Sequence, residues 1–528
     1  MKRIIASALA CLLALACFAT GAAAIETWEE MPPLIITYIT YEDFGAAGDG
    51  VTDDLDAIVA AHAEANERNL SVRANPEATY YIAQAGKTAV IQTDTDWGTA
   101  RFIIDDSKVQ VGQGHNLPIF EVTSTQAAQK IEGIGALEKG QTNIGVTLGC
   151  GALLHIADAD TLRYIRKGVN ANDGQAQQEV VRIDKDGNID PGTPIIWDYA
   201  AVTSATAYPV DAETLTVSGG QFTTIANQAE SFYNYHHRGI RVARSNTVVD
   251  GLQHLITGEL DHGAPYTGFV DVTRCTDVTV QNCTFSGHRF YPTQREGGIS
   301  QMGTYDININ NATNVTFKDC GQANSIHDSS LWGLMGSNYV KNITLDGVAF
   351  SRFDAHMGVH NATIKNSQLG HMGINLIGSG TALIENTTVS GRRFINLRSD
   401  YGSVWDGEVI IKNCVFNQSN GSGSDHVLLG GDNDGTHDFG FPCMMPRKIT
   451  IDGLVIRDKQ HSLLYFGPKI FDGFGGILLY IKDIFAKPPY PYGVTEEVVL
   501  RSITTESGMR LGKSLNFPRF WKVQVTRQ

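Results

Sequence analysis

Beyond its first 24 residues, the sequence lacks any apolar run long enough to span a bilayer. Segment 1–24 combines Lys2 and Arg3, an apolar stretch over 4–19 and a small-residue end at 22–24. This arrangement is typical of a secretory signal peptide, and we expect cleavage after Ala24. Cys17 leaves a lipoprotein as the alternative, although the usual leucine three positions before it is missing. We therefore expect a secreted or periplasmic protein without stable membrane insertion.

Positive charge is also scarce. The 528 residues contain 41 Lys and Arg against 56 Asp and Glu, which gives a formal net charge of −15 at pH 7. Loss of Lys2 and Arg3 with the signal peptide would bring this charge to −17. Proteins bind nucleic acids mainly through Lys and Arg contacts to the phosphates, so the acidic charge balance argues against nucleic acid as a partner.

Cysteine is rare, with eight in the chain and six after residue 24. Cys283, Cys320 and Cys414 occupy the same position of a repeated segment, which indicates small side chains stacked in a core. An oxidising compartment would permit disulfides between them, but nothing in their spacing indicates one.

A complete metal-binding loop is missing as well. Residues 184–190 alternate Asp and Asn, but the glycine is misplaced for an EF-hand and no distal Glu follows, so a turn is favoured. Residues 432–438 are similarly acidic and are expected to form a loop beside a groove. We expect no metal and no cofactor, with calcium as the alternative.

What the sequence does contain is a repeated segment between 268 and 467. Each copy has a short apolar strand, a bend with Asn or Gly and a second strand, and a polar corner follows. Repetition at about 20 to 35 residues with strand alternation predicts an all-β fold, a parallel β-solenoid. The seven copies are 278–285, 315–320, 343–350, 362–369, 382–389, 409–416 and 449–456.

The corner after each copy is the candidate functional region. Equivalent positions on successive coils lie about 4.8 Å apart, so a recurring residue type forms a column. A column of His, Asp and Arg predicts a titratable groove for an extended chain molecule. A ladder of polar residues that caps the turns is the alternative. The corner residues are His288, Arg289, His327, Asp328, Asp354, His356, His371, Arg392, Arg393, Asp425, His426 and His461.

The strand after each corner extends this groove. Segments 373–379 and 394–400 align, and side-chain alternation would turn Asn375, Asn396 and Arg398 outward. An internal asparagine ladder is the alternative for Asn375 and Asn396. Arg398 fits that alternative poorly, because a buried unpaired guanidinium is costly.

A long motif stands near the expected mature N-terminus: Asp43-Phe-Gly-Ala-Ala-Gly-Asp-Gly-Val-Thr-Asp-Asp54, followed by an amphipathic stretch from Leu55. It resembles the opening motif of the pectate-lyase-like superfamily, which includes polygalacturonase-like glycosidases, polysaccharide lyases and phage tailspikes. The resemblance implies a right-handed, single-stranded parallel β-helix with an N-terminal capping helix. The residues agree, since a helix capped by Asp53 or Asp54 would cover the open end of a core.

A second segment, 370–379, resembles the polygalacturonase segment in which Gly-His-Gly precedes a strand that ends in Ile-Gly-Ser. The resemblance implies that His371 lies at the floor of a cleft. The Asn-Thr-Asp and Asp-Asp of polygalacturonases are missing, and His327-Asp328 and Asp354-Ala-His356 stand in their place. Galacturonan is therefore not implied as the substrate.

The sequence predicts that the chain has four parts. The solenoid rhythm is poor between 110 and 235, which separates this region from the rest. The parts are a signal peptide (1–24), an N-terminal cap with the first coils (25–109), irregular coils or an inserted β module (110–235), and the main parallel β-helix with the groove (236–528).

The leading hypothesis is a secreted carbohydrate-active enzyme, a glycoside hydrolase that cleaves a polysaccharide. Hydrolysis needs a carboxylic acid and a carboxylate, and Asp328 and Asp354 are the predicted pair because they follow adjacent coils. His356 and His371 would tune this pair or bind hydroxyls. The predicted substrate contacts are His327, Trp332, Asn375, Arg393, Asn396, Arg398, Tyr401 and Trp405.

Two alternatives remain open. A polysaccharide lyase would use Arg393 or Arg398 to neutralise a uronate carboxylate and His356 or His371 to remove the adjacent proton. A non-catalytic glycan-binding β-helix is the third hypothesis. In each case the partner is a polysaccharide or oligosaccharide, and the protein is expected to be a monomer or a homotrimer.

Overall fold

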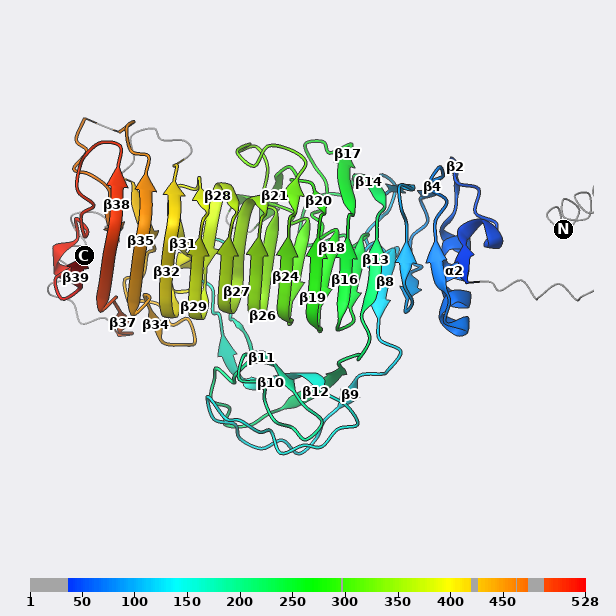
Figure 1. Cartoon of the computed structure of the whole chain (residues 1–528), viewed down its shortest axis with the longest axis horizontal. Coiled ribbons are helices and arrows are strands. Elements are labelled where there is room, and N and C mark those ends of the chain that lie inside the picture. Colours follow the sequence, from blue (N-terminus) through cyan, green and yellow to red (C-terminus); the bar gives the residue numbers. More distant parts are fainter. Residues whose placement is uncertain (1–36, 296–297, 419–425, 462, 473–488) are drawn as a thin grey trace, which may run out of the picture. The chain divides into compact units, whose positions relative to one another are not determined.

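Parallel β-strands make up nearly all the regular structure of this protein (Figure 1). The computed structural model describes residues 37–295, 298–418, 426–461, 463–472 and 489–528, so the expected signal peptide and Asp425 lie outside the described residues. From Tyr38 to Gln528 the chain forms one unit, in which 31 strands join into a single sheet wound into coils. The predicted parallel β-helix is therefore confirmed.

The coils have three faces, which we call A, B and C. Face A is formed by β1 (Tyr38–Thr40), β3 (Ser71–Arg73), β6 (Thr95–Asp96), β13 (Leu215–Ser218), β16 (Thr247–Asp250), β19 (Thr276–Gln281), β24 (Thr313–Lys318), the ends of β26 (Met335–Asp346) and β27 (Ala349–Lys365), β29 (Gly378–Glu385), the starts of β32 (Trp405–Phe416), β35 (Lys448–Ile456) and β38 (Glu497–Thr505), and β39 (Gln524–Arg527).

Faces B and C complete each coil. Face B contains β2 (Asp49–Asp53), β4 (Thr79–Ile82), β7 (Arg101–Asp105), β14 (Gln221–Ile225), β17 (Gln253–Thr257), β20 (Thr284–Phe285), β25 (Gly321–Gln322), the starts of β27 and β28 (Gln368–Leu376), β30 (Thr388–Val389) and the ends of β32, β35 and β38. Face C contains β5 (Ala89–Ile91), β8 (Phe120–Thr123), β15 (Ile240–Ala243), β18 (Val270–Thr273), β23 (Ile307–Asn310), the start of β26, the middle of β27, the end of β28, β31 (Arg393–Leu397), β33 (Val427–Gly430) and β36 (Lys469–Phe471).

One segment leaves the β-helix between β8 and β13. It contains four antiparallel strands in the order β11 (Gln175–Ile183), β10 (Ala152–Arg163), β12 (Ser204–Pro209) and β9 (Gln129–Lys130). This insert lies beside face A in Figure 1 and has its own apolar core. The irregular region expected at 110–235 thus contains the insert, while β8, β13 and β14 of the same range belong to the coils.

Short elements complete the chain. The helical turns are η2 (Tyr41–Phe44), η3 (Ser399–Tyr401) and α4 (Phe517–Phe520). An antiparallel hairpin of β21 (Tyr291–Arg295) and β22 (Gly298–Met302) extends from the corner between faces B and C, and β34 (Cys443–Met444) pairs with β37 (Tyr492–Gly493).

The helix α2 (Leu55–Arg68) covers the first coils, as the opening motif predicted (Figure 1). It begins after Asp54, whose carboxylate accepts from the backbone N–H groups of Ala47 and Gly48 and so fixes the glycine-rich turn. Its side chains at 55, 58, 61 and 65 are fully buried against the coils. The helix thereby closes the apolar core that would otherwise end in open strand edges.

Asparagines lie at bends with left-handed backbone inside the repeat copies, at 282, 366, 386 and 413, and also at the bend directly before a copy. Asn314, Asn342 and Asn361 have φ values of 53°, 58° and 63°, a region that Asn tolerates better than most residues. Their amides form a ladder, because Asn342 donates to Asn314 at 2.9 Å and Asn361 donates to Asn342 at 3.0 Å. The repeated Asn therefore turns the chain and joins successive coils at the same time.

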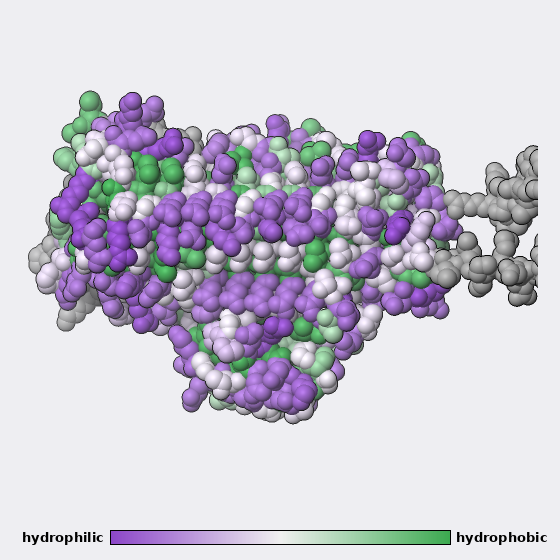
Figure 2. Space-filling model, viewed as in Figure 1, coloured by the Kyte–Doolittle hydropathy of each residue, from purple (hydrophilic) through white to green (hydrophobic). Residues whose placement is uncertain are grey.

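Near the end of each face A strand, the outward side chains alternate in charge from one coil to the next. Figure 2 shows hydrophilic rows that run across the strands of this face. Lys365 lies 3.2 Å from Asp346 and in register with Glu385. The row, which we call the charge ladder, consists of Lys318, Asp346, Lys365, Glu385, Lys412, Asp452 and Arg501.

Cys283, Cys320 and Cys414 are buried in the core as expected, and each is a free thiol. In the described part of the chain, no helix is long and apolar enough to cross a membrane.

Candidate functional site

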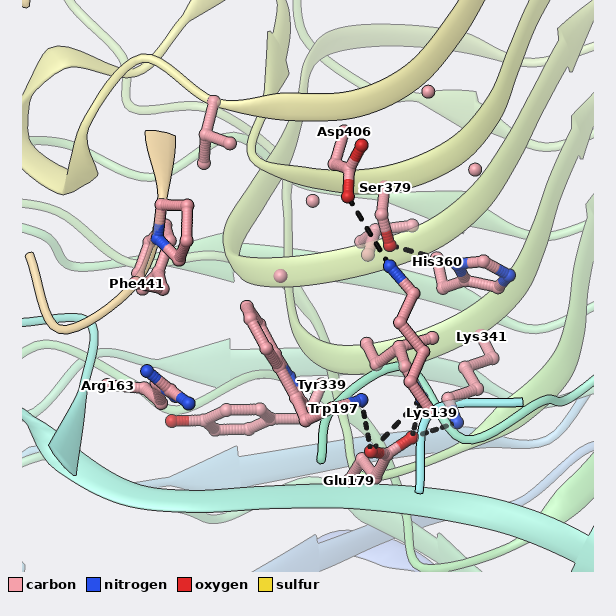
Figure 3. A pocket seen from close by; sticks show the side chains of 18 of the residues that line it. Lys139, Arg163, Glu179, Trp197, Tyr339, Lys341, His360, Ser379, Asp406 and Phe441 are labelled. Atoms are coloured by element: carbon pink, nitrogen blue, oxygen red, sulfur yellow. Dashed lines mark hydrogen bonds and ion pairs between the residues drawn. The ribbon is translucent and has the colours of Figure 1, made fainter. Parts of the chain in front are cut away.

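A cavity of about 670 Å³ lies between the insert and the corner where face C turns into face A (Figure 3). It exists because the insert folds back over the coils formed by β26, β27, β29 and β32. Its lining includes Lys139, Arg163, Glu179 and Trp197 of the insert, Tyr339, Lys341, His360, Ser379, Asp406 and Glu408 of the coils, and Phe441 and Arg447 of the segment after β33.

A buried ion pair joins the insert to the coils at this cavity. Glu179 of β11 accepts from the Lys341 ammonium at 2.5 Å, and both side chains are almost fully buried. The same carboxylate accepts from the backbone N–H groups of Ile196 and Trp197 at 3.0 and 3.2 Å. Burial lowers the pKa of Lys341 although the charge of Glu179 opposes that shift. The pair positions Trp197 and fixes the width of the cavity.

Aromatic rings form one wall. Trp197 is partly exposed, and its ring lies 5.8 Å from that of Phe441 and 4.9 Å from the guanidinium carbon of Arg163. Tyr339 of β26 is also partly exposed. Figure 3 shows these rings across the cavity from Asp406 and Ser379. The wall thus offers flat apolar surfaces next to a cation.

The opposite wall is polar. Lys139 extends from the insert to within 3.6 Å of Asp406, which also binds the Arg447 guanidinium at 3.0 Å (Figure 3). His360 shares a hydrogen bond of 2.9 Å with the Ser379 hydroxyl. Burial, helped by the nearby lysine charges, lowers the pKa of His360 to about 4. The imidazole is therefore neutral at pH 7 and offers one donor and one acceptor.

Asp354, predicted as a catalytic carboxylate, lies on face C away from this cavity wall. It is fully buried, and its Oδ2 accepts from Tyr305 at 2.5 Å and from Arg352 and Arg398 at 2.8 Å. Burial would raise the pKa of Asp354, but the two guanidinium charges outweigh burial and hold it well below its usual range. Asp354 is therefore an anion held by three donors.

Arg398 is not an unpaired guanidinium. Besides Asp354 it binds Asp400 through two nitrogens at 3.1 and 2.6 Å, and Asp400 in turn binds Arg166 of the insert at 2.9 Å. Tyr401 is buried between these two arginines. This network connects face C to the base of the insert.

His356 is partly buried beside this network. One of its ring nitrogens lies 3.0 Å from the amide oxygen of Asn338. Burial is the main cause that lowers the pKa of His356 to about 3, so the ring is neutral at pH 7.

Asn375 and Asn396 are in register on face C, and their amides lie 2.6 Å apart. Their neighbours Ile374, Leu376, Ile395 and Leu397 belong to the core, so both amides lie on the outward face of the coils and do not form an internal ladder. Arg393, expected beside the groove, forms an ion pair with Asp472 instead.

Of the other two predicted catalytic residues, Asp328 belongs to the loop between β25 and β26, and His371 belongs to β28 and contacts this loop. Asp328 is exposed on a turn, where it accepts from the N–H and hydroxyl of Ser330, and these bonds lower the pKa of Asp328. His327 is exposed nearby. The ring nitrogens of His371 lie 3.1 and 3.2 Å from the carbonyl oxygens of Ile326 and Leu331, so this histidine holds the loop.

The predicted stacking aromatics have different surroundings. Trp332 is partly exposed and has the Arg352 guanidinium 5.4 Å from its ring. Trp405 has no exposed surface and donates to the carbonyl oxygen of Gly380 at 3.0 Å, while Tyr401 is 2% exposed. Contrary to the expectation, neither Trp405 nor Tyr401 presents a free face to a sugar, because each is packed where two parts of the chain meet.

Sequence reasoning missed most residues of the cavity. Glu179, Trp197 and Lys139 lie in the region without solenoid rhythm, and no local pattern brings them to Lys341 or Asp406. The one available signal was the position of Asp406 directly after Trp405, just before the repeat copy 409–416.

No protein-family model matches the sequence, and no curated protein matches it. Among solved structures, the chain is similar to the tailspike gp61 of Pseudomonas phage phi297, with 12% identity, a TM-score of 0.49, and 93% of this chain and 84% of the other covered. It is similar to the tailspike gp49 of Pseudomonas phage LKA1, with 13% identity, a TM-score of 0.45 and coverage of 90% and 82%. It is also similar to PfbA, a surface adhesin of Streptococcus pneumoniae, with 12% identity, a TM-score of 0.38, and 90% of this chain and 93% of the other covered.

Proposed function

We propose that this protein binds a carbohydrate chain in the cavity between the insert and the β-helix. The observation that supports this is the lining, in which the partly exposed rings of Trp197 and Tyr339 face hydroxyl, imidazole and paired charged groups. Sugar rings present apolar faces that pack on aromatic rings, and their hydroxyls need fixed donors and acceptors. The volume of about 670 Å³ is that of a site for a few sugar units.

Cleavage of the bound glycan is the second candidate function. Asp406 and Glu408 both line the cavity and stand two positions apart on β32. Cα atoms at this spacing lie about 6.6 Å apart with their side chains on one face. The two carboxyl groups can therefore reach the separation of about 6.5–9.5 Å found in inverting glycosidases. The pair Asp328 and Asp354 remains the alternative, but Asp354 is fully buried under three donors and Asp328 lies on an exposed turn of the loop between β25 and β26.

Binding is tested by calorimetric titration of the protein with neutral and acidic oligosaccharides. We expect Trp197→Ala to weaken binding at least about 10-fold, as for other buried aromatic contacts. Trp521→Ala is the matched control, because Trp521 is 69% exposed at the C-terminal end of the coils and should not affect binding. Equal affinity of Trp197→Ala and the wild type would place any glycan site elsewhere.

Cleavage is tested by following new reducing ends together with ultraviolet absorbance from an unsaturated uronide. Reducing ends alone would indicate a hydrolase, and Asp406→Asn or Glu408→Gln should then abolish turnover while Asp328→Asn retains it. Reducing ends with absorbance would indicate the lyase, with a neutral histidine such as His360 as base. Binding without either signal would leave a non-catalytic glycan-binding protein.

We also propose secretion and an assembly of one or three chains. N-terminal sequencing of the exported protein tests cleavage after Ala24, and light scattering measures the number of chains.

A further inference from the structure

Two histidines and a carboxylate converge inside the corner between faces B and C, a different corner from the one that lines the cavity. They are His254 of β17, His288 after β20 and Asp306 before β23, and each side chain is at most 2% exposed. Nδ1 of His254 and Nε2 of His288 both lie 2.9 Å from Oδ1 of Asp306. Two successive coils, the second of which supplies both His288 and Asp306, therefore place three metal-binding atoms within 4.8 Å of one another.

The remaining polar atoms of this cluster are occupied by further partners. Nε2 of His254 lies 3.0 Å from the Thr224 hydroxyl, and Nδ1 of His288 lies 3.4 Å from the Glu259 carboxylate. Oδ2 of Asp306 accepts from the backbone N–H of Ser286 at 2.8 Å. Metal-bound histidines usually donate their other ring N–H to a carboxylate or another oxygen, which fixes the tautomer. His254 has such a support in the Thr224 hydroxyl, and the Glu259 carboxylate lies on the corresponding side of His288.

The small cavity beside the cluster and the acidic side chains around it are compatible with a bound divalent cation. A cavity of about 10 Å³, roughly the volume of one water molecule, is lined by all three side chains. Tetrahedral zinc with bonds of about 2.0–2.1 Å holds its ligand atoms roughly 3.3 Å apart. The present contacts would have to open by only a few tenths of an ångström. The carboxylates of Asp306 and Glu259 outweigh burial and raise the pKa of His288 to about 10, so a divalent cation would replace the proton on this imidazole and balance the two carboxylates.

We propose that His254, His288 and Asp306 form a binding site for a zinc ion. Zinc would be bound by Nδ1 of His254, Nε2 of His288 and Oδ1 of Asp306, with a water molecule in the small cavity as the fourth ligand. Any proton now held between these atoms is released on binding. Since the cluster is buried, the ion enters during folding and stabilises the corner from which the β21–β22 hairpin extends.

Zinc content is measured by mass spectrometry on protein expressed with added zinc chloride and purified in EDTA, which removes ions from the surface. We expect about one zinc per chain, and a melting temperature a few degrees above that of protein expressed under zinc limitation. A wild-type protein without zinc and with the same melting temperature under both conditions would overturn the proposal. The cluster would then be a hydrogen-bonded network only.

Variants locate the ion. His288→Gln and Asp306→Asn should lose the zinc, and Thr224→Val, which removes a support of His254, should weaken retention about 10- to 100-fold. His62→Gln is the matched control, because His62 is equally buried but lies under α2 and should keep the zinc. Zinc at wild-type level in both His288→Gln and Asp306→Asn would refute the site.

Discussion

At the scale of single residues, the Glu179–Lys341 pair fixes the insert on the β-helix. Both charges are withdrawn from water, and the carboxylate is further bonded to two backbone N–H groups beside Trp197. Such a pair adds little stability relative to an apolar pair, but loss of one partner leaves the other charge buried and uncompensated.

Glu179→Gln should therefore lower the free energy of unfolding by about 3 kcal/mol, because Lys341 would remain buried without a counter-charge. Urea unfolding followed by tryptophan fluorescence measures this change. Glu385→Gln, which removes a charge from the surface ladder, is the control and should cost less than about 1 kcal/mol. If Glu179→Gln costs no more than the control, the pair does not hold the insert.

At the scale of elements, register between coils is specified by face A. The inward residues of successive strands are aliphatic and nearly interchangeable, so they distinguish poorly between registers. The charge ladder and the Asn ladder add contacts that are satisfied in one register only. If a strand paired with the coil beyond its proper neighbour, two side chains of like charge would come together at that position.

Lys365→Glu tests the ladder. The new carboxylate would lie between Asp346 and Glu385, and three adjacent acids should lower the free energy of unfolding by about 1 kcal/mol at low salt. The melting temperature should recover partly at 1 M salt, where the Debye length is about 3 Å. Lys365→Gln separates loss of attraction from added repulsion and should show about half the effect. If the loss of stability in Lys365→Glu were the same at low and high salt, it would result from altered packing and not from charge repulsion.

At the scale of the whole molecule, burial keeps several histidines neutral. It is the largest cause that lowers the pKa of His236, His237 and His360 to about 4 and that of His62 and His356 to about 3. The same residues have a pKa of about 6.5 in an unfolded chain. Between these values, the unfolded state therefore binds more protons than the folded state.

Stability should consequently fall as the pH is lowered from about 6.5 to 4, by up to about 1.4 kcal/mol per pH unit for each histidine. Below about pH 4 the buried anion Asp354 adds to the loss, because its pKa in the folded protein is lowered. Urea midpoints across this range measure the slope. His62→Gln removes one titrating group and should reduce the slope of the unfolding free energy against pH by up to about 1.4 kcal/mol per pH unit. Stability that does not change between pH 6.5 and 4 would contradict the neutral state of these histidines.

The repeat, the opening motif and the Asn bends determined the fold, because strand alternation and left-handed turns are local properties that recur on every coil. They also indicated that polar residues gather at the corners, among them His288 and Asp354. Local pattern could not distinguish a side chain that faces a groove from one enclosed in ion pairs, and so Asp354, Arg398 and Trp405 were all expected in an open site.

The cavity and the histidine cluster were decided only by the tertiary structure. Glu179 and Lys341 are 162 positions apart, and His254 and Asp306 are 52 apart. Contacts at such separations depend on how many coils lie between the residues and on where the insert returns to the β-helix. The alternation of residue types along each strand carries neither piece of information.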